Sequence, residues 1–140
     1  MNLLRVDHTA IVVADMDDAL ARYGRIWGLE PNIRTEIRDQ RVEIAFLPVG
    51  DTQLELIRPL DADSGVARFL DRHGESLHHI GIAVDDVRAE LEALSKDGVP
   101  LIDHQPRRGV HGLIAFVHPR GSGGVLIELV QNTHDAWLQA

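Results

Sequence analysis

The sequence lacks several features that would point to particular classes of protein. It contains no cysteine, so disulfide bonds and thiolate metal ligands are excluded. No apolar run approaches the length needed to cross a bilayer, and the N-terminus has no signal-peptide pattern. These absences predict a cytoplasmic protein that does not enter a membrane.

Positive charge is also in short supply. Lys and Arg total 14 against 22 Asp and Glu, which gives a formal net charge of −8. A general nucleic-acid binder needs a basic face, so we expect no nucleic-acid partner. A phosphorylated small molecule could still be held by local arginines such as Arg107, Arg108, Arg38 and Arg120, although solvated surface charge is the more common role for such residues.

Patterns of nucleophilic or phosphate-binding sites are missing as well. No Ser-His-Asp arrangement and no nucleophile elbow appears in the sequence. The run 121–124 is glycine-rich, but no Lys-Ser/Thr follows it and it enters a predicted strand, so it is not a phosphate loop. With 44% apolar and 26% charged residues, the 140-residue chain has the composition of one compact globular domain.

An internal repeat organises the chain. Residues 77–84 match residues 6–13 when His79 is set on His8, an offset of 79 − 8 = 71. Residues 126–130 match residues 53–57 when Glu128 is set on Glu55, an offset of 128 − 55 = 73. Each copy therefore contributes one histidine and one glutamate from predicted strands.

The two copies predict the same order of elements, one strand, one helix and three strands. Asp15 is placed to cap the first helix and Gly28 to end it. We expect a single domain over 1–140, with a first module at 5–59, a connector at 60–76 and a second module at 77–131. The first module is predicted to hold a strand at 5–13, a helix at 16–27 and strands at 31–37, 41–48 and 52–58. The rest is predicted to hold a short helix at 64–72, a strand at 77–84, a helix at 86–97 and strands at 99–104, 113–118 and 124–131. The basic stretch 107–112 is predicted to be a flexible loop.

The repeated histidines and glutamates predict a metal site. Strand side chains alternate, and each of these residues falls on a largely apolar face. A carboxylate on such a face is costly unless it is paired or coordinated. A single strand histidine is more often structural, but two accidents would not recur at offsets of 71 and 73. Imidazole and carboxylate together suit a divalent first-row metal. The predicted ligands are His8, Glu55, His79 and Glu128.

Other titratable residues are weaker candidates. His78 must face away from its neighbour His79, so we expect it to pack or hydrogen-bond on the other face. Glu43 lies on a predicted strand with Ala45 and Leu47 on its face. The pattern leaves open whether it is an exposed strand glutamate or a carboxylate beside the metal that moves a proton. The remaining histidines have no repeat partner and are expected at the surface or in loops: His104, His111, His118 and His134.

Together these motifs resemble the vicinal oxygen chelate superfamily, which has the glyoxalase-like fold, and within it the methylmalonyl-CoA epimerases. The resemblance covers about residues 5–131. Its most specific parts are the runs 7–11, 42–44, 53–57, 77–80, 118–119 and 123–129. The connector, with Pro59-Leu60 leading to Phe69-Leu70, is similar too.

The resemblance implies an α+β fold in which two βαβββ modules form a curled eight-stranded mixed sheet around a metal cleft, in a homodimer. It implies the same four ligands for one divalent ion, cobalt first, with manganese, nickel or zinc as alternatives. Some of these epimerases have glutamine where Glu55 stands.

The implied reaction interconverts the C2 epimers of methylmalonyl-CoA, an acyl-CoA substrate. Glu43 and Glu128 match the family's proposed acid/base pair. The C2 proton lies between a thioester and a carboxylate, so a metal-stabilised enolate and one base on each face suffice for a two-base proton transfer.

One departure from the family concerns the acyl group. After Gly112 these epimerases commonly have one more residue before the next strand, whereas Leu113 follows at once here. Two alternatives therefore stay open. One is another metal-dependent glyoxalase-like lyase, isomerase or dioxygenase, and the other is a non-catalytic small-molecule-binding protein of the same fold. A ring-cleaving dioxygenase would normally hold iron with two histidines and one carboxylate, so a second glutamate favours non-redox chemistry.

Overall fold

The computed structural model describes residues 2–132, and His134 lies outside the described residues. The strands of this part form one mixed sheet of eight strands, in the order β2-β3-β4-β1-β5-β8-β7-β6. By its contacts the chain divides into two compact units. One comprises residues 8–78, and the other comprises residues 1–7 with 79–140. We name them the His8 unit and the His79 unit.

The His8 unit contains most of the first predicted module and the connector. Three strands follow one another antiparallel, β2 with β3 and β3 with β4, while β4 runs parallel to β1. Its elements are β1 (Leu3–Val12, from residue 8 on), α1 (Met16–Trp27), β2 (Ile33–Ile37), β3 (Val42–Val49), β4 (Thr52–Pro59), α2 (Gly65–His73) and the start of β5 (Ser76–Val84).

Short polar side chains start the helices. Asp15 accepts a hydrogen bond from the backbone N–H of Asp18 at the start of α1, and Gly28 ends that helix in the left-handed conformation. Ser64 caps α2 in the same manner through the N–H of Ala67. Each cap satisfies a backbone donor that has no partner inside the helix. The predicted cap and terminator of the first helix are confirmed.

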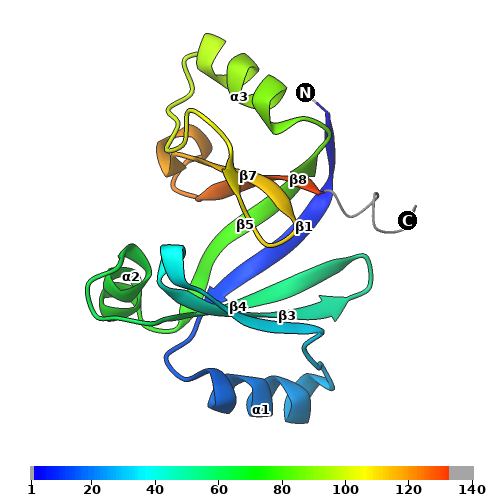
Figure 1. The fold of residues 1–140 in the computed structure, drawn as a ribbon, viewed down its shortest axis with the longest axis vertical. Coiled ribbons are helices and arrows are strands. Elements are labelled where there is room, and N and C mark those ends of the chain that lie inside the picture. The colour runs from blue at the N-terminus through cyan, green and yellow to red at the C-terminus, as the bar shows by residue number, and fades with distance from the viewer. Residues whose placement is uncertain (1, 133–140) are drawn as a thin grey trace. The chain divides into compact units, whose positions relative to one another are not determined.

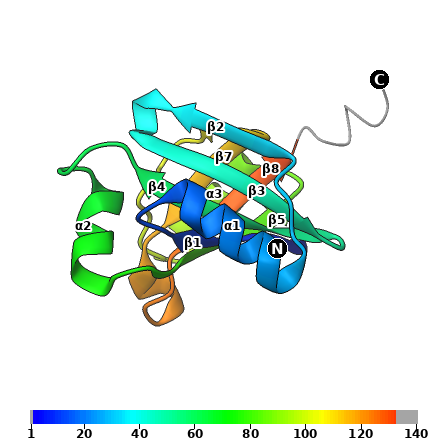
Figure 2. The same cartoon turned by 90° about the horizontal axis from the view of Figure 1, so that it is seen from below.

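The sheet of the His8 unit is covered differently on its two faces. Buried side chains of α1 pack with Ala45, Leu47 and Leu56 on one face, and Figures 1 and 2 show α1 lying along β3 and β4. On the other face Ala10, Ile44, Phe46 and Ile57 form a second cluster, to which α2 adds Val66. His8 and Glu55 belong to this second face, because Ala10 is opposite Glu55 in the register and His8 is two residues before Ala10.

The His79 unit repeats this plan with shorter strands. From residue 79 its elements are β5 (Ser76–Val84), α3 (Val87–Lys96), β6 (Arg107–Arg108), β7 (Gly112–Val117) and β8 (Ile127–Asn132). Strand β5 pairs parallel with β8, and β6, β7 and β8 follow antiparallel. Helix α3, capped by Asp86, packs on the face of Ala115, Val117 and Leu129.

The predicted α+β class with two strand-helix-three-strand modules in an eight-stranded mixed sheet is confirmed, while the module boundaries remain predictions. One strand was misplaced. Residues 99–104 form only an isolated bridge at Leu101, and the corresponding strand is β6, inside the stretch predicted to be a loop. Pro100 has no N–H to donate to a ladder, which disfavours a strand there.

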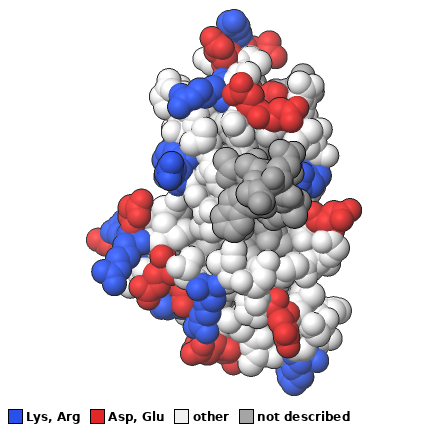
Figure 3. Space-filling view, turned by 45° about the vertical axis from the view of Figure 1, so that its right-hand side comes forward, with Lys and Arg blue, Asp and Glu red and all other residues white. Residues whose placement is uncertain are grey.

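The described residues show no membrane-spanning helix and a face of mixed charge. None of their helices is long and apolar enough to span a membrane. On the face shown in Figure 3, acidic and basic side chains of the described residues are interspersed.

Candidate metal site and its surroundings

His8 and Glu55 lie side by side in the His8 unit. They come from neighbouring strands β1 and β4, and His8 Nε2 is 3.9 Å from Glu55 Oε1. That distance is too long for a hydrogen bond. Both residues are buried, with 3% and 9% of their surface exposed. The ring of His8 meets the ring of Phe46 edge-on, with centroids 6.1 Å apart.

His79 and Glu128 form the matching pair in the His79 unit. They come from β5 and β8, and His79 Nε2 is 2.8 Å from Glu128 Oε2. Both are buried, at 4% and 7% exposure. The ring of His79 meets Phe116 edge-on at 5.3 Å.

The strand registers explain why the pairs match. Ala10 is opposite Glu55, and Gly81 is opposite Glu128. His8 is two residues before Ala10, and His79 is two residues before Gly81. Each histidine therefore lies on the same face of its sheet as the glutamate. Phe46 is opposite Glu55 and Phe116 is opposite Glu128, so each pair is also backed by a phenylalanine. The sequence repeat thus corresponds to a repeat of strand register.

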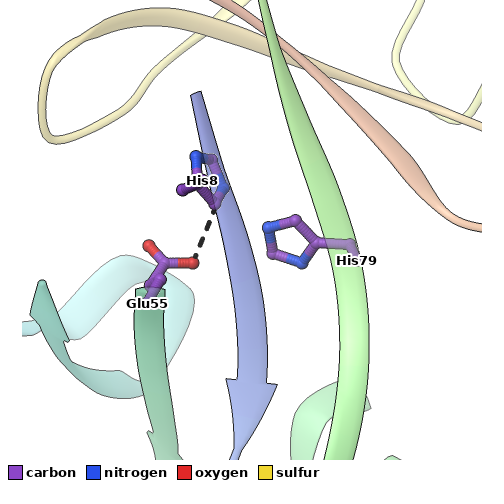
Figure 4. Close-up of side chains that lie close together, drawn as sticks. All are labelled: His8, Glu55 and His79. Atoms are coloured by element: carbon purple, nitrogen blue, oxygen red, sulfur yellow. Dashed lines mark ion pairs between the residues drawn. The ribbon is translucent and has the colours of Figure 1, made fainter. Parts of the chain in front are cut away.

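Three of the four predicted ligands form a group that could hold a metal ion. His8, Glu55 and His79 are all buried, and each offers one ligand atom that a metal ion could bind. Figure 4 shows the three side chains, with the His8–Glu55 pair marked. Glu128 was predicted as the fourth ligand, and it is linked to this group through its contact with His79.

The donor chemistry fits a divalent cation. Imidazole nitrogen and carboxylate oxygen are ligands for first-row divalent metals, with metal–ligand distances of about 2.0–2.2 Å for zinc. Buried carboxylates are also costly to leave without a cation or hydrogen-bond donors. Among the described residues, His8, Glu55 and His79 would hold such an ion, with Glu128 as the predicted fourth ligand.

Glu43, the predicted base, has different surroundings. It is opposite Arg58 in β4, and it points to the face that carries Ala45 and Leu47, not to the face of Glu55. Its Oε1 accepts a hydrogen bond from Arg58 Nε at 2.9 Å and its Oε2 accepts one from Arg34 Nε at 3.0 Å. The structure therefore does not bring Glu43 into the group of donor atoms.

The two arginines set the charge state of Glu43. Burial by itself would raise the pKa of this carboxyl, but the hydrogen bonds from Arg58 and Arg34 and their positive charges outweigh it and hold the pKa below its usual value. Arg34 in turn has a raised pKa, because it also pairs with Asp17 in the first turn of α1, at 2.7 Å. Glu43 is thus a carboxylate in an ionic network that ties β2, β3 and β4 to α1.

His78 and His118 have contacts outside the group of predicted ligands. His78 faces away from His79, as predicted, and its ring meets Phe69 of α2 edge-on at 4.7 Å. His118 accepts a hydrogen bond from the N–H of Arg120 and caps a short 3-10 turn. The contacts of Phe46 and Phe116 with the two histidines were not predicted from the sequence. Their signal was available, because Phe46 is nine residues before Glu55 in one copy and Phe116 is twelve before Glu128 in the other, on matching strands.

Comparison with known proteins places the chain in a family. Residues 7–117 match the profile of the glyoxalase/bleomycin resistance protein/dioxygenase superfamily. The chain belongs to this superfamily. The predicted resemblance is thereby confirmed, and the repeated module with its His and Glu pairs is this chain's version of the glyoxalase-like fold.

Within the superfamily the chain is similar to epimerases. It is 36% identical to the human mitochondrial methylmalonyl-CoA epimerase, over 93% of this chain and 75% of the human protein. It is 42% identical to the uncharacterized protein YqjC of Bacillus subtilis, over 94% of both chains.

Solved structures agree with these sequence relatives. The methylmalonyl-CoA epimerase of Mycobacterium tuberculosis superimposes with a TM-score of 0.90 at 34% identity, covering 97% of this chain and 93% of that one. A methylmalonyl-CoA epimerase in complex with methylmalonyl-CoA and NH4+ gives 0.88 at 34% identity, covering 94% and 96%.

Proposed function

We propose that this protein is a metal-dependent epimerase that interconverts the two C2 epimers of methylmalonyl-CoA. The observation that carries the proposal is the buried group of His8, Glu55 and His79 donor atoms, in a chain about one third identical to methylmalonyl-CoA epimerases over most of its length. A structure of one such epimerase holds methylmalonyl-CoA, which supports an acyl-CoA as the substrate.

The proposed chemistry uses the acidity of the C2 proton. His8, Glu55, His79 and Glu128 would hold a divalent cation, which would supply stabilisation of the negative charge that develops on the thioester oxygen. Glu128 accepts the proton from one face of C2, and a second base supplies a proton to the opposite face. The His-Glu pairs are buried beside the apolar rings of Phe46 and Phe116, and electrostatic interactions are stronger in such low-dielectric surroundings than in water.

Glu43 is the proposed second base because of the family resemblance. Its contacts argue for a different role, since both of its oxygens accept hydrogen bonds from arginines and its pKa is lowered. A lowered pKa keeps the carboxylate ionised, as a base requires, but also makes it a weaker proton acceptor.

Deuterium exchange tests the proposed function directly. The protein is incubated with methylmalonyl-CoA in deuterated water, and loss of the C2 proton is followed by NMR or mass spectrometry. We expect exchange with a divalent metal, loss of exchange with a chelator, and recovery when cobalt is added back. Absence of exchange at every metal tested would contradict the epimerase.

The same samples separate the alternative functions. Oxygen consumption with a catechol, measured with iron, would indicate a ring-cleaving dioxygenase instead. Tight binding of an aromatic drug by the metal-free protein, with no turnover, would indicate a binding protein.

Three further properties belong to the proposal: a homodimer, a cytoplasmic location and cobalt as the preferred metal. Sedimentation analysis tests the first and cell fractionation the second. Metal analysis of protein purified without added metal, followed by activity titration with cobalt, manganese, nickel and zinc, tests the third.

A further inference from the structure

Arg107 lies on the same sheet face as the His79–Glu128 pair. Arg107 is in β6, opposite Ile114 of β7, and Ile114 shares its face with Phe116. Phe116 is opposite Glu128, and its ring contacts His79. The guanidinium of Arg107 lies over the Phe116 ring, 5.6 Å from the centroid. The Phe116 ring thus contacts both the positive charge of Arg107 and the predicted metal ligand His79.

Arg107 is held in place by Asp103. Its Nε lies 3.1 Å from Asp103 Oδ1 and its Nη2 lies 3.2 Å from Asp103 Oδ2. Asp103 is itself fixed, because its Oδ2 accepts a hydrogen bond from the backbone N–H of Phe116 at 2.8 Å. This two-point contact and the ring beneath it define the orientation of the guanidinium.

The guanidinium of Arg107 has N–H groups that its contacts with Asp103 do not use. A guanidinium carries five N–H groups in a fixed fork, and the contacts with Asp103 use two of the nitrogens. The side chain is 47% exposed, so its remaining donors are accessible to a ligand. Arginine suits this role because it stays charged and matches the geometry of carboxylates and phosphates.

The repeat shows that this cation is not required by the fold. Thr35 is opposite Ile44 in the His8 unit, just as Arg107 is opposite Ile114 in the His79 unit. Equivalent strands with equivalent His-Glu pairs thus carry a neutral side chain in one unit and a positive charge in the other. Arg108, next along β6 and opposite Leu113, points to the other face.

We propose that Arg107 is a specificity-determining residue that binds an anionic group of the substrate beside the His79–Glu128 pair. The ligand chemistry is a carboxylate or a phosphate, supplied either by the acyl group or by the coenzyme. This inference rests on the proposed function for the identity of the substrate. The charge, its fixed orientation and its position on the site face are independent of that function.

Binding measurements with separated anions test the inference. The wild-type protein, Arg107→Gln, Arg107→Lys and the matched control Arg108→Gln are each titrated with malonate, coenzyme A and methylmalonyl-CoA by calorimetry, with cobalt present. We expect Arg107→Gln to weaken binding of at least one anion by roughly 10–100-fold, the range for a lost hydrogen bond to a charged group. Arg107→Lys should recover part of the loss, and Arg108→Gln should stay within about twofold of the wild type.

The pattern of losses identifies the source of the anion. A loss confined to malonate and methylmalonyl-CoA assigns the carboxylate, and a loss confined to coenzyme A and methylmalonyl-CoA assigns a phosphate. The weakening of binding by salt should also shrink in Arg107→Gln, an effect that a purely structural role would not produce. Thermal melts of each variant report its folding.

Two results would overturn the inference. One is equal affinities of Arg107→Gln and Arg108→Gln for all three anions, and the other is no binding of any of them by the wild-type protein. The deuterium-exchange assay stands apart from this test. Exchange together with equal anion affinities of Arg107→Gln and Arg108→Gln refutes the inference alone, and anion binding through Arg107 without exchange refutes the epimerase alone.

Discussion

The two units carry the same donors on one face of their sheets but different chemistry on the other. In the His8 unit, the face that packs against α1 contains Glu43 between Arg58 and Arg34, and Arg34 continues to Asp17 of the helix. In the His79 unit, Leu113 is opposite Gln131, where the His8 unit has Glu43 opposite Arg58. There Gln131 accepts a hydrogen bond from the backbone N–H of Val87 at the start of α3, at 3.0 Å.

The difference shows which parts of the repeat are constrained. Residues that could share one cation need the same side chains at the same register in both copies. The opposite face only has to fasten a helix to a sheet, and charged groups or a neutral amide can do this. Glu43 therefore belongs, by its contacts, to the part of the molecule that differs between the units.

The largest expected effect concerns His8 and His79, and it tests whether the two units contribute equally to metal binding. We expect His8→Ala and His79→Ala each to lower cobalt affinity by more than the roughly 10–100-fold that loss of an outer partner of a metal ligand costs. Calorimetric titration measures the affinity. His78→Ala is the matched control, because this side chain is on the other face of β5 and packs on Phe69. A large loss in only one of the two variants would show that the units do not share a cation.

The second-largest expected effect concerns Glu43, on the sheet face that packs against α1. Glu43→Gln removes the negative charge between two arginines, and we expect it to lower the free energy of unfolding by about 1–3 kcal/mol with cobalt affinity unchanged. Urea denaturation measures the stability. Glu36→Gln is the control, since Glu36 is exposed and opposite Glu43 in β2.

The same variant decides the role of Glu43 in proton transfer. Loss of C2 exchange in a folded, metal-loaded Glu43→Gln protein would support the base predicted from the family resemblance. Full exchange would leave Glu43 with its structural role only.

A pH dependence should follow from the Glu43 network. The folded-state pKa of Glu43 is below its usual value of 4.5, so the network stabilises the fold fully above about that pH. This stability should be lost as the pH falls through the lower, folded-state pKa. Urea unfolding of the wild type and Glu43→Gln from pH 6 downward should give curves that converge in acid. A constant difference between the two would contradict the lowered pKa.

The smallest expected effect concerns the uncharged hydrogen bond between Gln131 and the backbone of Val87 in the His79 unit. Gln131→Ala removes the acceptor for the Val87 N–H, and we expect a loss of about 0.5–1.5 kcal/mol, less than for Glu43→Gln. Gln105→Ala is the control, because Gln105 is exposed and its contact with Arg88 is long, at 3.3 Å. A loss equal to that of Glu43→Gln would remove the contrast between the two faces.

Much of the fold was predictable because local patterns encode it. The cap at Asp15 and the glycine at Gly28 predicted the bounds of α1, and both act through neighbouring backbone atoms. The strand β6 could not be predicted, since two residues have no periodicity and pair only through β7. The site residues His8 and Glu55 were predicted from the repeat, not from either residue alone.

The sequence by itself determined the class of the fold and the repeated placement of His8, Glu55, His79 and Glu128, because strand alternation and spacing are properties of the chain taken in order. Only the tertiary structure decided which charges meet. Glu43 accepts hydrogen bonds from one arginine on β2 and one on β4. The guanidinium of Arg107 lies over the ring of Phe116. These contacts depend on how strands pair side by side, and a pattern read along one strand does not specify its neighbours.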